Sequence, residues 1–151
     1  AAFAGAALVT AKRYALGFSA IAFSAILNVV QVGVGLTQFG PFSAAAEVNP
    51  DLGEVAFSVV AFSFFGYNAA KILLGLAAFV FGIAKMGEGG KILGSVTMIV
   101  GAVAFVANTL VMMFGIQSFL PSPVAGASGV MATLLLAFCL FGVDSEAVRG
   151  E

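Results

Sequence analysis

The sequence has 151 residues, of which 62% are hydrophobic and only 9% are charged, against about 25% charged in soluble domains. A soluble domain of this size cannot hide so much apolar surface, because its surface-to-volume ratio is high, so lipid is the expected solvent. The formal net charge of −1 argues against a nucleic-acid partner, which would require a basic surface.

The first stretch, AAFAGAALVTAKR, is not an intact secretory signal. Its basic pair, Lys12 and Arg13, follows the apolar residues, whereas a signal peptide carries its charge in front of them. Two interpretations stay open. The stretch is either the mature end left by a removed targeting sequence or a start that lies on the membrane surface.

Four later stretches are long and apolar enough to cross a bilayer core of about 30 Å, which takes roughly 20 helical residues. In lipid, such uniform runs satisfy their backbone hydrogen bonds only as helices, since they are too long and too uniform for barrel strands. The sequence therefore predicts an all-α, polytopic membrane protein, with one integral-membrane domain over 1–151 and four transmembrane helices in a bundle. The predicted helices are 14–39, 55–84, 92–116 and 124–143.

Three polar or glycine-rich segments separate these helices. GPFSAAAEVNPDLGE (40–54) carries two prolines and three acids, KMGEGGK (85–91) is glycine-rich and charged, and SFLPSP (118–123) has two prolines. Proline suits the start of a helix better than its interior. We therefore expect each of these segments to interrupt the helical structure.

Four crossings place both termini and the 85–91 turn on one side of the membrane. The opposite side holds the 40–54 loop, which has acids and no base. The positive-inside rule then predicts that both termini lie on the cytoplasmic side, or on the stromal or matrix side of an organelle. Five of the six basic residues belong to that side: Lys12, Arg13, Lys85, Lys91 and Arg149.

Small and polar residues recur at helical spacing and mark the faces on which helices are expected to pack, because leucine gains nothing by leaving lipid. In the third predicted helix they are seven residues apart, which indicates left-handed close packing. The helix-packing residues predicted there are Gly94, Gly101 and Gly115, with Asn108 in the same series.

Lys71 is a charged residue inside the apolar second helix, on a face that it shares with Asn68. A charge near the bilayer midplane costs several kcal/mol unless it is paired, and none of the four predicted helices contains an acid. One hypothesis is that Lys71 binds an anionic headgroup or an acid of a neighbouring subunit. The other is that its stem snorkels toward the headgroups. Lys71, Asn68, Lys85 and Lys91 are the predicted lipid- or partner-binding residues.

The intramembrane amides are most simply interhelical hydrogen-bonding groups. A second hypothesis is that Asn28, Gln31 or Asn108 ligates the magnesium of a chlorophyll, since oxygen ligands suit magnesium. The absence of histidine from the sequence weighs against it. Bound lipid is thus the expected ligand, with chlorophyll or carotenoid as the alternative, and no other metal site is predicted.

The sequence predicts no catalytic residues and no enzyme activity, because it offers no paired intramembrane acids and no histidine or cysteine site. The one cysteine, Cys139, has apolar neighbours and is expected to be an inert buried thiol. We therefore expect a structural or accessory subunit of a larger membrane complex, photosynthetic or respiratory, in a thylakoid or bacterial inner membrane. Its partners would be other membrane subunits, copies of itself and lipids.

Two alternatives remain. Residues 81–102, FGIAKMGEGGKILGSVTMIVGA, loosely resemble the helix, basic turn and helix of conjugative pilins, in which basic residues meet lipid headgroups. That resemblance implies a self-assembling pilin-like or secretion-system subunit. The second alternative is a small transporter or channel, although transporters usually carry charges on several helices.

Overall fold

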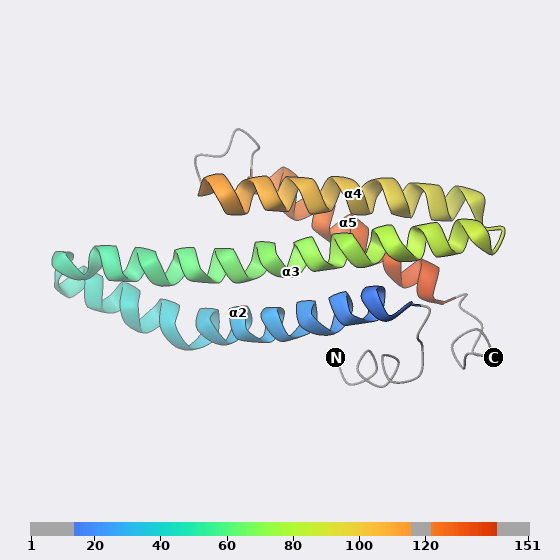
Figure 1. The fold of residues 1–151 in the computed structure, drawn as a ribbon. Coiled ribbons are helices and arrows are strands. Elements are labelled where there is room, and N and C mark those ends of the chain that lie inside the picture. Colours follow the sequence, from blue (N-terminus) through green and yellow to red (C-terminus); the bar gives the residue numbers. More distant parts are fainter. Residues whose placement is uncertain (1–13, 116–121, 142–151) are drawn as a thin grey trace.

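The computed structural model describes residues 14–115 and 122–141 and shows an all-α four-helix bundle (Figure 1). In the described part, four helices are long and apolar enough to cross a membrane, so the chain is an integral multi-pass membrane protein. The elements are α2 (Ala15–Val48), the short 3₁₀ helix η2 (Pro50–Leu52), α3 (Gly53–Gly87), α4 (Lys91–Phe114) and α5 (Ser122–Leu140).

Helix α3 is the central element of the bundle. It packs against α2, α4 and α5, while α5 also packs against α4. Successive helices run in opposite directions, so the start of α2, the turn between α3 and α4, and the end of α5 lie at one end of the molecule (Figure 1). The hairpin of α2 and α3 projects beyond α4 at the other end (Figure 1).

The prediction of a loop at 40–54 is wrong, because most of this segment is helical. Helix α2 continues through Pro41 to Val48, and α3 begins at Gly53. Proline in a helix interior removes one backbone hydrogen bond, but its fixed φ is itself helical. Here Pro41 and Thr37, whose carbonyl loses that bond, are both exposed. Helix α2 bends toward α3 in this part of the chain (Figure 1).

The reversal between α2 and α3 is made by Asn49 and η2. The Asn49 side chain accepts a hydrogen bond from the Asp51 backbone N–H at 3.1 Å, and Pro50 occupies the first position of η2. Both features are typical of a helix start. The turn therefore lies at the end of segment 40–54, where the asparagine and proline occur together.

The 85–91 segment does reverse the chain, in a turn shorter than expected. Helix α3 runs to Gly87 and α4 starts at Lys91. Gly89 has a φ of +91°, a backbone conformation that side-chain-bearing residues rarely adopt. The Gly90 N–H then donates to the Lys85 carbonyl at 3.0 Å and closes the end of α3.

Two glycines on each helix let α3 and α4 approach closely. A Cβ built on Gly101 would lie 2.6 Å from the Phe79 backbone nitrogen and 2.7 Å from the Gly75 carbonyl oxygen. A Cβ built on Gly94 would lie 2.7 Å from the Gly82 carbonyl oxygen. Gly94 and Gly101 thus lie at the expected packing positions, and Gly75 and Gly82 form the matching half of the contact on α3.

Gly115 departs from the predicted series. It is exposed, a Cβ built on it would have nothing within 4 Å, and its φ is +62°. Its backbone N–H donates to the Val111 carbonyl, so Gly115 ends α4. The seven-residue repeat continues in the sequence, but the helix has ended before it can serve for packing.

Candidate functional site

The site is built around Lys71, which α3 presents to α5. The aliphatic stem of Lys71 lies against Gly129, where an added Cβ would be 2.8 Å from Lys71 Cδ and 2.9 Å from Cγ. One turn earlier in α3, the Tyr67 hydroxyl lies 3.5 Å from the position of a Cβ on Gly126. The two glycines, three residues apart on α5, therefore make room for two large α3 side chains.

The ammonium of Lys71 lies 5.3 Å from the centroid of the Tyr67 ring, a cation–π contact. Within the described residues it has no hydrogen bond and no ion pair. Lys71 is half-buried, and its Nζ is not among the fully enclosed polar atoms. The charge therefore reaches the surface of the bundle, with one aromatic face as its only charge-stabilising contact in the described part.

Asn68 does not assist Lys71. Its Nδ2 donates to the Phe64 carbonyl of its own helix at 2.8 Å, and its side chain is buried. The register of the glycine contacts explains the difference. Helices α3 and α4 are antiparallel, and Gly75 contacts Gly101. Seven residues earlier on α3 and seven residues later on α4, the same register places Asn68 across from Asn108. Asn68 thus belongs to the α3–α4 interface and Lys71 to the α3–α5 interface.

Two neighbouring helices fix the depth of Lys71. Helix α4 is 24 residues long, about 36 Å, and α5 is 19 residues long, about 28 Å, so these two match a bilayer core of about 30 Å. Gly129, against which Lys71 lies, is two residues from the middle of α5, or about 3 Å. Gly75, one turn from Lys71, contacts Gly101 near the middle of α4. With α4 and α5 spanning the core, both helices place Lys71 close to its midplane.

This depth argues against snorkelling. The hydrocarbon core extends about 15 Å to either side of its midplane. A lysine side chain reaches roughly 6 Å along an apolar surface. The Lys71 ammonium therefore stops well short of the headgroups when α4 and α5 define the core.

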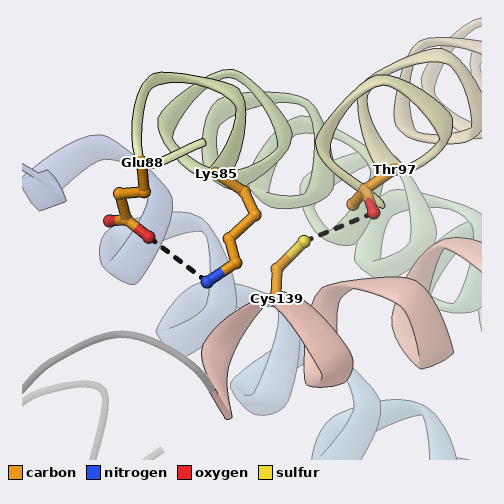
Figure 2. A network of polar contacts seen from close by, with 4 residues as sticks. All are labelled: Lys85, Glu88, Thr97 and Cys139. Atoms are coloured by element: carbon orange, nitrogen blue, oxygen red, sulfur yellow. Dashed lines mark hydrogen bonds and ion pairs between the residues drawn. The ribbon is translucent and has the colours of Figure 1, made fainter. Parts of the chain in front are cut away.

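Lys85 and Lys91 lie at the end of the bundle, away from Lys71. Figure 2 shows Lys85 Nζ directed at Glu88, and the two atoms of this ion pair, Nζ and Oε2, are 3.3 Å apart. Lys91 is exposed at the first residue of α4. The three lysines predicted to bind lipid or a partner therefore lie at two separate locations. Lys71 lies at mid-depth of the bundle, and Lys85 and Lys91 lie at the turn between α3 and α4.

The polar residues of α2 connect it to α3. Ser24 Oγ donates to the Ala70 carbonyl at 2.9 Å, and Gln31 Nε2 donates to Ser63 Oγ at 3.1 Å. Asn28 Nδ2 donates to the Ser24 carbonyl of its own helix at 3.0 Å. Ser24 and Gln31, seven residues apart, thus tie the same pair of helices at two levels.

Asn108 connects α4 to α5. Its Nδ2 donates to the Ala104 carbonyl at 2.8 Å and to the Ala125 carbonyl at 3.2 Å, and the side chain is fully buried. Its Oδ1 has no hydrogen-bond partner among the described residues. Protein atoms enclose this oxygen, so it does not reach the surface of the described bundle. Asn28 and Gln31 lie on α2 and do not converge with Asn108 on a common site.

Cys139 is buried and interhelical. Its Sγ donates to Thr97 Oγ1 of α4 at 3.3 Å, as Figure 2 shows. The Thr97 hydroxyl in turn donates to the Leu93 carbonyl at 2.7 Å. No group of three or more histidine, cysteine, aspartate or glutamate side chains that could hold a metal ion occurs within residues 14–115 and 122–141.

Gly126 and Gly129 are not among the residues predicted from the sequence. Their spacing of three residues in the segment GASG is the signal that would have marked a close-packed face of α5. The rotation of α3 about its own axis decides which side chains fill that space, and this rotation cannot be read from the sequence.

Comparison with known proteins found no family model that matches the chain, and no match among curated proteins or solved structures.

Proposed function

We propose that the protein is a non-catalytic accessory subunit of a larger membrane protein complex. The observation that carries this proposal is Lys71, a cation at mid-depth of the bundle with no acidic partner in the described part of the chain. A lysine at the centre of the bilayer costs several kcal/mol, and such residues normally pair with another group. A partner outside this chain accounts for a charge that the described part of the chain leaves uncompensated.

The rest of the bundle supports a packing role. Hydrogen bonds tie α2 to α3 and α4 to α5, and glycine contacts bring α3 against α4 and α5. The face that carries Lys71 is therefore held by the surrounding helices. A rigid face binds a neighbour with little loss of conformational freedom. In this proposal the chain orients one charge toward its partner.

The distribution of charge supports the orientation that goes with this function. Lys85 and Lys91 lie at one end of the bundle, whereas Glu47, Asp51 and Glu54 lie at the other. With the basic end on the cytoplasmic or stromal side, the hairpin of α2 and α3 faces the opposite compartment.

Native mass spectrometry of the protein, gently extracted from its own membrane, tests the proposal. We expect recovery with at least one different polypeptide in a fixed ratio. Recovery of the chain alone would overturn the proposal. Recovery only as copies of itself would also overturn it, in favour of self-assembly.

A further inference from the structure

We infer that Lys71 is the docking point for a transmembrane helix of a different polypeptide, one that carries a carboxylate near the middle of the bilayer. This inference rests on the proposed function and specifies the partner. It follows from the depth of the ammonium, from the acids of this chain and from the apolar surface around the site.

The depth selects a protein partner over a lipid headgroup. Lys71 lies against the middle of α5 and one turn from a residue that contacts the middle of α4. Lipid phosphates lie beyond the hydrocarbon core, about 15 Å from its midplane. A carboxylate carried by a membrane-spanning helix is the anion that reaches the Lys71 ammonium.

The positions of the described acids argue against a second copy as the source of that carboxylate. Each acid among the described residues lies at or beyond a helix end, in the α2–α3 reversal or in the α3–α4 turn. The other three follow α5 in the sequence. In two bundles side by side in one bilayer, the four acids of the described part stay at the membrane surfaces. The seven acids are Glu47, Asp51, Glu54, Glu88, Asp144, Glu146 and Glu151.

The surroundings of Lys71 suit a helix. Phe64, two turns before Lys71 on α3, is 52% exposed, and Val130, next to Gly129 on α5, is 58% exposed. A helix that docks there places apolar side chains on these residues while one carboxylate meets the ammonium. A charge pair removed from water inside an apolar rim is stronger than the same pair at a surface.

A model peptide provides the test. The protein is reconstituted in zwitterionic phosphatidylcholine vesicles at pH 8, with a synthetic leucine–alanine transmembrane helix that carries one central Glu. A matched peptide carries Gln instead, and energy transfer between labels on protein and peptide measures association. We expect the Glu peptide to associate about tenfold more tightly, in the range of measured intramembrane polar interactions. Lys71→Met should abolish the preference, whereas Lys71→Arg should keep it. Gln38→Met, a change at an exposed polar residue of α2, is the control and should keep it too.

Equal association of the Glu and Gln peptides with the wild-type protein would overturn the inference, and this comparison needs no variant to fold. A preference that survives Lys71→Met would overturn it as well. Both outcomes are separate from failure of the proposed function. A chain recovered with other polypeptides in native mass spectrometry keeps the proposed function even if the peptides show no preference.

Discussion

At the scale of single residues, a few buried hydroxyls and amides connect helices that apolar packing alone would leave free to slide. Ser24 is buried on α2, and its Oγ donates to the Ala70 carbonyl of α3. In lipid, neighbouring leucines gain no hydrophobic energy by meeting each other, so such bonds carry more of the specificity. Ser24 is the clearest case, because replacing it with alanine removes one oxygen and little volume.

We predict that Ser24→Ala lowers the free energy of unfolding by about 1 kcal/mol, since one interhelical hydrogen bond is lost and the Ala70 carbonyl keeps its helical partner. The measurement is unfolding in mixed detergent micelles, followed by circular dichroism. Ser58→Ala is the matched control. Ser58 is exposed, its Oγ donates within its own helix to the Glu54 carbonyl, and its loss should have little effect. Equal effects of the two changes would contradict the role of Ser24.

At the scale of elements, the contact of α3 with α4 depends on backbone approach. Gly75 and Gly82 on α3 face Gly101 and Gly94 on α4, and the atoms that an added Cβ would meet are mainly backbone atoms. Backbone cannot rotate away as a side chain can. A methyl group at these positions therefore has to separate the two helices.

We predict that Gly101→Ala lowers the free energy of unfolding by about 1–3 kcal/mol, as overpacking of a close contact does. Gly33→Ala is the control. Gly33 lies inside α2, and a Cβ there would have nothing within 4 Å, so alanine should be neutral or stabilise the helix by up to about 1 kcal/mol. Unfolding of both variants in mixed micelles measures the difference. A destabilising Gly33→Ala and a neutral Gly101→Ala would refute the assignment of the contact.

These elements show which parts of the fold are predictable from sequence. The lengths of the apolar segments predict the number of helices, and the seven-residue spacing predicts that Gly94 and Gly101 lie on a packing face. Helix ends are harder, because proline and acids suggested a loop at 40–54 where α2 continues through Pro41. The neighbouring helix that each helix face contacts depends on how the helix is rotated about its axis. Asn68 and Lys71 therefore looked like one site in the sequence but lie at two interfaces.

At the scale of the whole molecule, the alternating helices place the α3–α4 turn and the α2–α3 reversal at opposite ends (Figure 1). We predict that single cysteines at these two places label from opposite sides of the membrane. Glu88→Cys and Asp51→Cys are both at exposed positions, and the native Cys139 is buried and should react slowly. With the protein in the inner membrane of intact bacterial cells, a maleimide that does not cross that membrane should label Asp51→Cys at once. Glu88→Cys should label only after permeabilisation. Labelling of both from one side would contradict the four-crossing arrangement.

The lengths of the helices carry a further consequence for the position of the bilayer. Helices α2 and α3 have 34 and 35 residues, about 51 and 53 Å, whereas α4 and α5 are close to the core thickness. If α4 and α5 define the hydrocarbon core, the tip of the α2–α3 hairpin stands outside it, and Lys71 lies near the midplane. The middle of α3 is residue 70, so a core centred on α3 leaves Lys71 at the midplane as well. Only a core that begins at the tip of the hairpin puts Lys71 about 12 Å from the midplane, where snorkelling becomes sufficient.

The sequence has no tryptophan, so one introduced indole reports its own depth. Phe105 lies near the middle of α4 and is 39% exposed, and Phe57 lies near the tip of the hairpin and is 58% exposed. We predict that the fluorescence of Phe105→Trp is strongly quenched by lipids brominated near the ends of their acyl chains. That of Phe57→Trp should be weakly quenched, because the tip lies outside the core. The reverse order would move the core toward the hairpin, and with it would remove the need for a partner acid at Lys71.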